Sequence, residues 1–179
     1  EGLVDYLENI VKSHATTPIH ETIFSITKDH EETGSKVAFV MQWTEATDEH
    51  LKSYVNGIPT ESGGTHENGF RSGLTKAIRN VIETHNLTPK GLTLTADDIR
   101  EGLFVVLSIL VKNPQFQGQT KDRLNNPEIA SAIDSIIRPA VEHWLNHNLS
   151  TAKEIVGRII MAARAREASR VAQQLVARK

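Results

Sequence analysis

The sequence of 179 residues contains no cysteine, which excludes disulfide bonds and thiolate metal sites. It has no run of about 18 apolar residues, so no membrane-spanning helix is expected. No signal-peptide pattern opens the chain, and Glu1 already belongs to a helical pattern. We therefore expect a cytoplasmic piece of a longer protein, with no membrane contact.

Strong charge of one sign is also lacking, since the formal net charge is −2. This balance argues against a general nucleic-acid-binding domain. The charge is uneven, however. Residues 151–179 contain seven basic and two acidic residues, a net charge of +5, so the remainder carries −7. This basic segment either contacts a phosphate backbone or forms a solvated helix, and the charge pattern alone leaves both open.

Two common nucleotide-binding signatures, the P-loop and Gly-x-Gly-x-x-Gly, are absent. Residues 61–66 form a glycine-rich turn between a strand and a helix, which is able to hold an anion. The pattern favours Thr65 as the N-cap of that helix. Further along, Thr95 precedes Asp97 and Asp98, and this spacing favours helix capping over a metal site.

A metal site is not expected elsewhere either. His143 and His147 are four residues apart on a predicted helix, a spacing that zinc sites use. The glutamate of a zinc peptidase is missing between them, and neither a cysteine nor a third histidine has a matching position.

Apolar periodicity predicts an α+β fold with three or four strands, helices on one face, and a helical extension. The strand over 102–111 is apolar without alternation, which is typical of a strand covered on both faces. Pro127 should occupy the first position of a helix capped by Asn126, and Pro139 predicts a kink or break in it. The predicted strands cover 22–28, 36–43, 51–58 and 102–111, and 87–95 has room for a short one; the main helices cover 3–11, 65–82, 126–145 and 150–179.

The last helix is long for a domain of this size. Thirty residues at 1.5 Å each span about 45 Å, which exceeds the width of a small domain. We expect one structural unit made of a body, residues 1–149, and a connecting helix, residues 150–179, whose far end projects from the body.

A short polar loop follows the most apolar strand. Pro114 ends the strand, Gly118 permits a turn, and Gln119 and Lys121 follow. Lysine is a compact cation that contacts phosphate as a point charge. On the residues alone the loop is either an anion contact or an ordinary solvated loop.

Four blocks of sequence, in order, resemble the B subunits of bacterial type IIA DNA topoisomerases, the family of gyrase and topoisomerase IV. Together they cover nearly the whole chain. The blocks are Gln119-Thr120-Lys121 with Asp122-Arg123-Leu124, Tyr54 to Pro59 running into Gly63-Gly64-Thr65-His66, Asp97 to Leu103, and Ala162 to Ala168.

The resemblance implies a transducer domain that couples ATP binding and hydrolysis in a preceding ATPase domain to DNA strand passage. Lys121 and Gln119 would contact the ATP γ-phosphate. Arg71 matches an arginine that lines a DNA cavity in the family, and Lys76 and Arg79 lie on the same helix. The sheet would resemble the second domain of a small-subunit ribosomal protein.

The resemblance also implies the parent assembly. ATP and Mg²⁺ would be bound mainly by the ATPase domain, which this sequence lacks, as it lacks the metal-binding cleavage domain. Two B subunits and two A subunits would act on double-stranded DNA in a bacterial, nucleoid-associated enzyme. The fragment alone should be inactive. The motifs favour gyrase, with topoisomerase IV as the alternative; a free ribosomal-type nucleic-acid-binding module is a third interpretation.

Overall fold

A computed structural model describes residues 2–117 and 121–177. The helices are α1 (Leu3–Ser13), α2 (Thr65–His85), α3 (Ala96–Arg100), α4 (Pro127–Asn146) and α5 (Leu149–Ala177). The strands are β1 (Phe24–His30), β2 (Ser35–Trp43), β3 (His50–Val55), β4 (Ile58–Pro59) and β5 (Leu103–Leu110). The described helices include none that is both long and apolar enough to cross a membrane.

The strands form one mixed sheet in the order β1-β2-β5-β3-β4. β5 is the central strand: it pairs antiparallel with β2 and parallel with β3. Leu103 to Leu107 are all buried, because the sheet is covered on both faces along this strand. The prediction of a doubly covered strand is confirmed.

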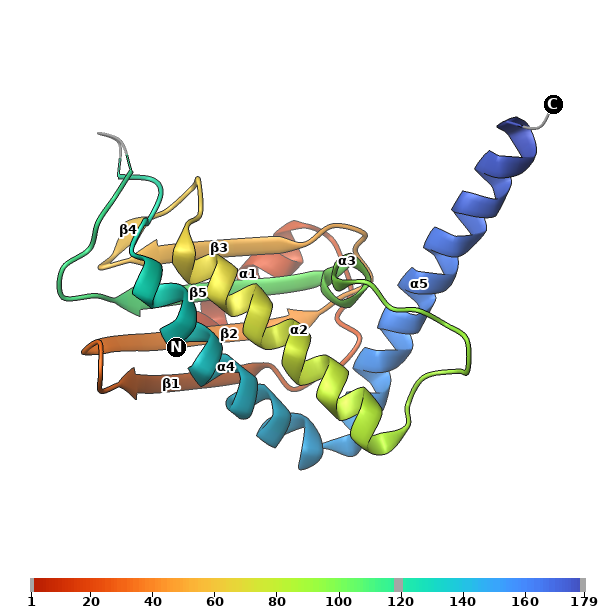
Figure 1. Cartoon of the computed structure of the whole chain (residues 1–179), viewed down its shortest axis with the longest axis horizontal. Coiled ribbons are helices and arrows are strands. Elements are labelled where there is room, and N and C mark those ends of the chain that lie inside the picture. Colours follow the sequence, from red (N-terminus) through yellow and green to blue (C-terminus); the bar gives the residue numbers. More distant parts are fainter. Residues whose placement is uncertain (1, 118–120, 178–179) are drawn as a thin grey trace.

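The two faces of the sheet pack against different helices (Figure 1). Phe39 and Leu107 belong to the large core that α2 and α4 close. Val40 and Phe104 point the other way and pack against α1 through Leu7. The prediction of helices on one face is therefore right for α2 and α4 and wrong for α1. Residues that alternate along a strand point to opposite faces, so each strand supplies both cores.

The predicted strand over 51–58 is instead a tight hairpin. β3 ends at Val55 and β4 begins at Ile58, and the turn residues Asn56 and Gly57 have φ angles of 52° and 80°. Asn-Gly with positive φ at both positions is typical of a type I′ turn. The Asn56 side chain also binds the backbone of Val111 at 2.8 and 3.0 Å, which ties the hairpin to the end of β5.

The N-cap residues of α3 and α4 agree with the sequence-based predictions, whereas the N-cap residue of α2 does not. Thr95 forms a capping box with Asp98, as predicted. Pro127 is the first residue of α4 after Asn126, as predicted, and α4 runs through Pro139 without a break. Thr65 is not an N-cap: Gly64 occupies that position, and the Thr65 hydroxyl is buried without a hydrogen-bond partner in the described part of the chain. No strand forms within 87–95.

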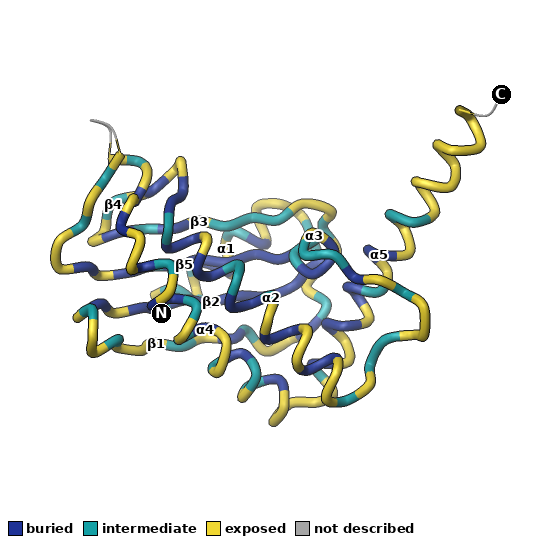
Figure 2. The backbone as a smooth tube through the Cα atoms, viewed as in Figure 1, coloured by how far each residue is buried: buried dark blue, intermediate teal, exposed yellow. Residues whose placement is uncertain are grey.

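Helix α5 leaves the body, as the sequence predicts. Its first half is buried on one side through Ile155, Ile159 and Ala163. Between Arg164 and Ala177 no residue is fully buried, and Val176 exposes 74% of its surface. Figure 2 shows this half as an exposed rod beyond the body. It departs from the end of the sheet opposite the loop that follows β5 (Figure 1).

Candidate functional site

The loop that carries Lys121 connects β5 to α4. We call residues 113–126 the lysine loop; Gln119 lies outside the described residues. Lys121 is exposed and has a φ angle of 56°. Within the described part of the chain, none of its contacts is a hydrogen bond or an ion pair. Its ammonium group is therefore available to an anion.

The base of the lysine loop is closed by backbone pairing. Phe116 and Leu124 form an antiparallel bridge, and the amide of Gln117 donates to the carbonyl of Arg123 at 2.8 Å. Asn126 is buried and spans the two ends: it accepts from the Gln115 amide at 2.5 Å and donates to the Asn113 carbonyl at 3.0 Å. Asn126 occupies the N-cap position of α4, as predicted, but its side chain makes no capping hydrogen bond and holds the loop instead.

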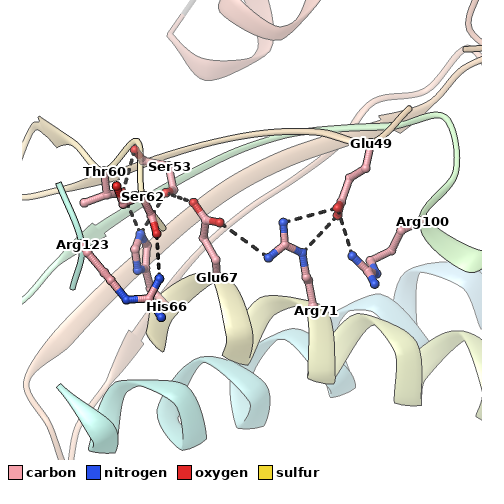
Figure 3. A network of polar contacts seen from close by, with 9 residues as sticks. All are labelled: Glu49, Ser53, Thr60, Ser62, His66, Glu67, Arg71, Arg100 and Arg123. Carbon is pink, nitrogen blue, oxygen red and sulfur yellow. Dashed lines mark hydrogen bonds and ion pairs between the residues drawn. The ribbon is translucent and has the colours of Figure 1, made fainter. Parts of the chain in front are cut away.

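A buried polar cluster lies at the start of α2 (Figure 3). The hydroxyl of Ser53 donates to the Glu67 carboxylate at 2.5 Å and lies 2.6 Å from the hydroxyl of Thr60. The His66 Nε2 atom lies 2.9 Å from both hydroxyls. The Thr60 hydroxyl donates to the Ser53 carbonyl at 3.0 Å, so with Glu67 ionised and Ser53 donating to it, the Nε2–H group of His66 is the donor toward the two hydroxyl oxygens in one connected chain of contacts. Such a chain holds its members in one arrangement.

Burial shifts the pKa of both ionisable members of this cluster. It lowers the pKa of His66 from 6.5 to about 4 and raises that of Glu67. In each case the low-dielectric surroundings disfavour the charged form. His66 is therefore neutral at pH 7.

Stability should fall as the pH is lowered from about 6.5 to 4. In that window the unfolded chain binds a proton at His66 that the folded chain does not, so the unfolding free energy decreases, by up to about 3 kcal/mol. Urea unfolding between pH 7.5 and 4.5 measures this slope, and His66→Gln should flatten it. The exposed His147→Gln is the matched control. Equal slopes for the wild type and His66→Gln would contradict the assignment.

The three cations predicted on α2 all have partners within the chain. Arg71 forms ion pairs with Glu49 at 3.3 Å and Glu67 at 3.6 Å (Figure 3). Lys76 pairs with Asp134 on α4 at 2.9 Å. Arg79 donates to the carbonyl of Leu94 at 3.1 Å. Contact of Arg71, Lys76 and Arg79 with DNA stays a prediction.

Two arginines that sequence reasoning did not single out fasten α5 to the body. Arg158 is 9% exposed and donates to the Thr44 and Ala46 carbonyls at 3.1 and 2.7 Å and to Glu101 at 3.0 Å. The sequence does contain a signal for this burial: Arg158 lies three residues after Ile155, on the apolar side of the helix.

The second arginine lies one helical turn beyond the last buried residue of α5. Arg166 binds the capping carboxylate of Asp98 at 3.1 Å and the carbonyl of Thr93 at 3.1 Å. Asp98 is 4% exposed, and burial by itself raises the pKa of its carboxyl. The hydrogen bonds from Arg166 and from the Thr95 backbone lower this pKa by more than burial raises it, so the net shift is downward. Asp98 thus caps α3, as predicted, and also holds α5.

The described residues contain no group of three or more His, Asp or Glu side chains arranged to hold a metal ion. The rings of His143 and His147 are 4.1 Å apart, and the His147 ring binds the carbonyl of His143. Carboxylate ligands for Mg²⁺ are thus not assembled in the described part of the chain.

The structure thus has an exposed lysine on a closed loop and a rod-like helix at the far end of the sheet. We compared the sequence and the fold with those of known proteins. The sequence profile of DNA gyrase B matches residues 2–175. The chain belongs to the DNA gyrase B family. The B subunit of DNA gyrase from Mycolicibacterium smegmatis is 40% identical over 99% of this chain, which spans 26% of that relative's length.

Two solved structures contain the same fold. The 43K ATPase domain of Thermus thermophilus gyrase B, in complex with an aminocoumarin, matches 97% of this chain with a TM-score of 0.89 and 30% identity. The match covers 46% of that chain. The topoisomerase IV ATP-binding domain of Francisella tularensis matches 92% of this chain, and 43% of its own, with a TM-score of 0.76 and 33% identity. This gyrase B family chain is thus similar to about half of each of those two chains.

Proposed function

We propose that this gyrase B family chain is a transducer domain, which couples the state of a nucleotide in a preceding ATPase domain to DNA strand passage. Residues 1–149 form its body and residues 150–179 its connecting helix. The observation that carries the proposal is Lys121, an exposed cation on a closed loop at the opposite end of the sheet from α5.

Lys121 distinguishes ATP from ADP by charge. A ligand shifts a conformational equilibrium only if it binds one conformation more tightly than the other. The γ-phosphate adds negative charge that the Lys121 ammonium neutralises when the lysine loop enters the nucleotide site, and Gln119 supplies a further donor there. ATP therefore favours the docked loop more than ADP does.

Helix α5 transmits the resulting movement. Arg158 fastens its first half to Thr44, directly after β2, and Arg166, at the start of its second half, fastens it to α3 through Asp98, so the helix moves with the body as one unit. Its exposed second half reaches beyond the body and would carry the rotation toward the DNA-cleavage domain.

The remaining parts of the site and the assembly belong to the parent enzyme. The ATPase domain supplies the Mg²⁺ ligands, and Lys121 fits a phosphate because it is an exposed cation. A second B subunit and two A subunits complete the enzyme around double-stranded DNA. Arg71, Lys76 and Arg79 would face the DNA cavity. The mixed sheet with α2 and α4 on one face is compatible with the fold of the ribosomal-protein second domain.

The purified chain alone should show no ATP hydrolysis above the buffer rate and no DNA cleavage. The proposed contact of this chain with the nucleotide is Lys121 on the γ-phosphate, and its described residues contain no group arranged to hold a metal ion. A coupled ATPase assay and a plasmid relaxation assay measure the two activities. Adding back the ATPase domain in one polypeptide is the positive control for hydrolysis, the full-length B subunit with its A subunit is the positive control for relaxation, and turnover by the chain alone would overturn the assignment.

Topoisomerase IV is the second candidate, favoured by the Francisella tularensis match. The parent B subunit, reconstituted with its A subunit, decides between the two. Negative supercoiling of relaxed plasmid identifies gyrase, whereas decatenation without supercoiling identifies topoisomerase IV.

A further inference from the structure

We propose that residues 62–65, called here the anchor segment, position Lys121 for its contact with the γ-phosphate, and that Gly64 is the positioning residue on which this depends. The inference rests on the proposed function of Lys121. It concerns a segment that lies about 60 residues earlier in the sequence and that touches the lysine loop directly.

The anchor segment and the C-terminal side of the lysine loop pair like two strands. Gly64 and Leu124 form a parallel bridge, in which the Leu124 amide donates to the Gly63 carbonyl and the Thr65 amide donates to the Leu124 carbonyl, both at 3.1 Å. Leu124 is completely buried. The loop is therefore fixed at Leu124 and exposed at Lys121.

Two contacts extend this pairing toward Lys121. The Ser62 amide donates to the Asp122 carbonyl at 2.9 Å, and its hydroxyl donates to the Asp122 carboxylate at 3.0 Å. The Arg123 guanidinium donates a hydrogen bond to the Ser62 carbonyl at 2.9 Å (Figure 3). The residue next to Lys121 is thus held through both its backbone and its side chain.

Gly64 is required because the two backbones approach too closely for a side chain. Its φ angle is 139°, which L-residues rarely adopt, and a Cβ atom there would lie 2.3 Å from the Leu124 carbonyl oxygen and 2.6 Å from its amide nitrogen. Any side chain must push Leu124 away and break the bridge.

The buried cluster at the start of α2 gives the anchor segment its rigidity. A Cβ atom on Gly63 would meet the Glu67 carboxylate at 2.9 Å, so this carboxylate lies directly against the segment. Glu67 is held in turn by Ser53 and Arg71. The buried side chains of Ser53, Thr60, His66 and Glu67 therefore share one structural role. Together they fix the surface against which Leu124 lies.

The physical effect is a restriction on where Lys121 can go. Lys121 precedes Leu124 by three positions, so its Cα atom stays within about 10 Å of a fixed point. Without the pairing, the lysine loop would still be closed on itself through Gln117 and Arg123 and through Asn126, but its C-terminal side would be attached to the body only where α4 begins. Ordering the loop in the nucleotide site would then cost more conformational entropy, and fewer loop conformations would reach the phosphate.

The test compares Gly64→Ala with Gly57→Ala in the full-length B subunit with its A subunit. Gly57 also has a positive φ, 80°, but a Cβ atom there meets nothing within 4 Å. We expect Gly64→Ala to lower the ATPase kcat by about tenfold or more, since a misplacement near 1 Å can cost about 10²-fold. ADP affinity should stay within twofold, because ADP lacks the γ-phosphate, and Gly57→Ala should match the wild type.

The outcomes separate this inference from the proposed function. In a Lys121→Ala background Gly64→Ala should add less than about twofold, because both changes remove the same contact. A folded Gly64→Ala enzyme with wild-type kcat overturns the inference and leaves the function of Lys121 intact. Full activity of Lys121→Ala overturns the proposed function itself.

A milder change covers the case in which Gly64→Ala does not fold. Arg123→Ala removes the side-chain contact with Ser62 at an exposed position. We expect a severalfold loss of kcat with unchanged ADP affinity and an unchanged melting temperature. Wild-type kcat in this variant would also overturn the inference.

Discussion

Replacing Lys121 with alanine in the full-length B subunit should lower ATP turnover by about 10²- to 10³-fold, the loss expected when one charged donor to a developing negative charge is removed. The side chain is exposed and has no ion-pair partner in the described part of the chain, so its removal leaves no buried group unsatisfied. The melting temperature of the domain should stay within a degree or two. Steady-state ATPase assays and thermal unfolding measure the two quantities.

Lys112→Ala is the matched control for this prediction. Lys112 is an exposed lysine in the same connection between β5 and α4, and its side chain lies against Gly34 in the β1–β2 turn. We expect its loss to change ATP turnover by less than about threefold, since the long-range effect of one surface charge is screened by salt. A Lys121→Ala enzyme with the turnover of Lys112→Ala would remove Lys121 from the mechanism.

Replacing Arg158 with alanine should lower the unfolding free energy of the chain by about 3 kcal/mol. The guanidinium is 9% exposed and supplies hydrogen bonds to two carbonyls and to Glu101. Alanine leaves these acceptors without their donor and opens a gap between α5 and the β2–β3 connection. In the parent enzyme we expect ATP turnover to persist while strand passage per ATP falls, because α5 loses a fastening point.

Urea unfolding followed by circular dichroism measures the first effect, and the ratio of topology change to ATP hydrolysis measures the second. Lys153→Ala is the control, an exposed cation on the same helix for which a change within about 0.5 kcal/mol is expected. A loss below about 1 kcal/mol in Arg158→Ala would show that the hydrophobic contacts of Ile155 and Ile159 suffice to hold α5.

Local patterns in the sequence predicted several elements correctly because the interactions that form them lie within a few residues. The apolar run of β5 requires cover on both faces wherever it packs. The capping box of Thr95 and Asp98 closes within one helical turn. The length of α5 follows from an unbroken helical pattern, and its projection follows because the apolar side ends before the helix does.

Other features depended on contacts between distant parts of the chain. The apolar stripe of α1 shows that the helix is buried, but Leu7 carries no information about which face of the sheet receives it. Arg71 lies off the apolar stripe of α2 and was linked to a DNA cavity only by the family resemblance; its ion pair with Glu49 could not be predicted, because only the fold brings Glu49 within reach. The Asn56-Gly57 turn was a local signal that the prediction of a single strand over 51–58 overlooked.

The sequence alone thus determined the family, the class of fold, the exposed lysine loop and the long final helix, since these follow from short patterns and ordered motifs. The tertiary structure decided what holds the loop and the helix in place. Gly64 meets Leu124, and Arg158 meets Thr44, across 60 and 114 residues of sequence. A single sequence encodes no distance between such residues, because that distance depends on how all the intervening elements pack.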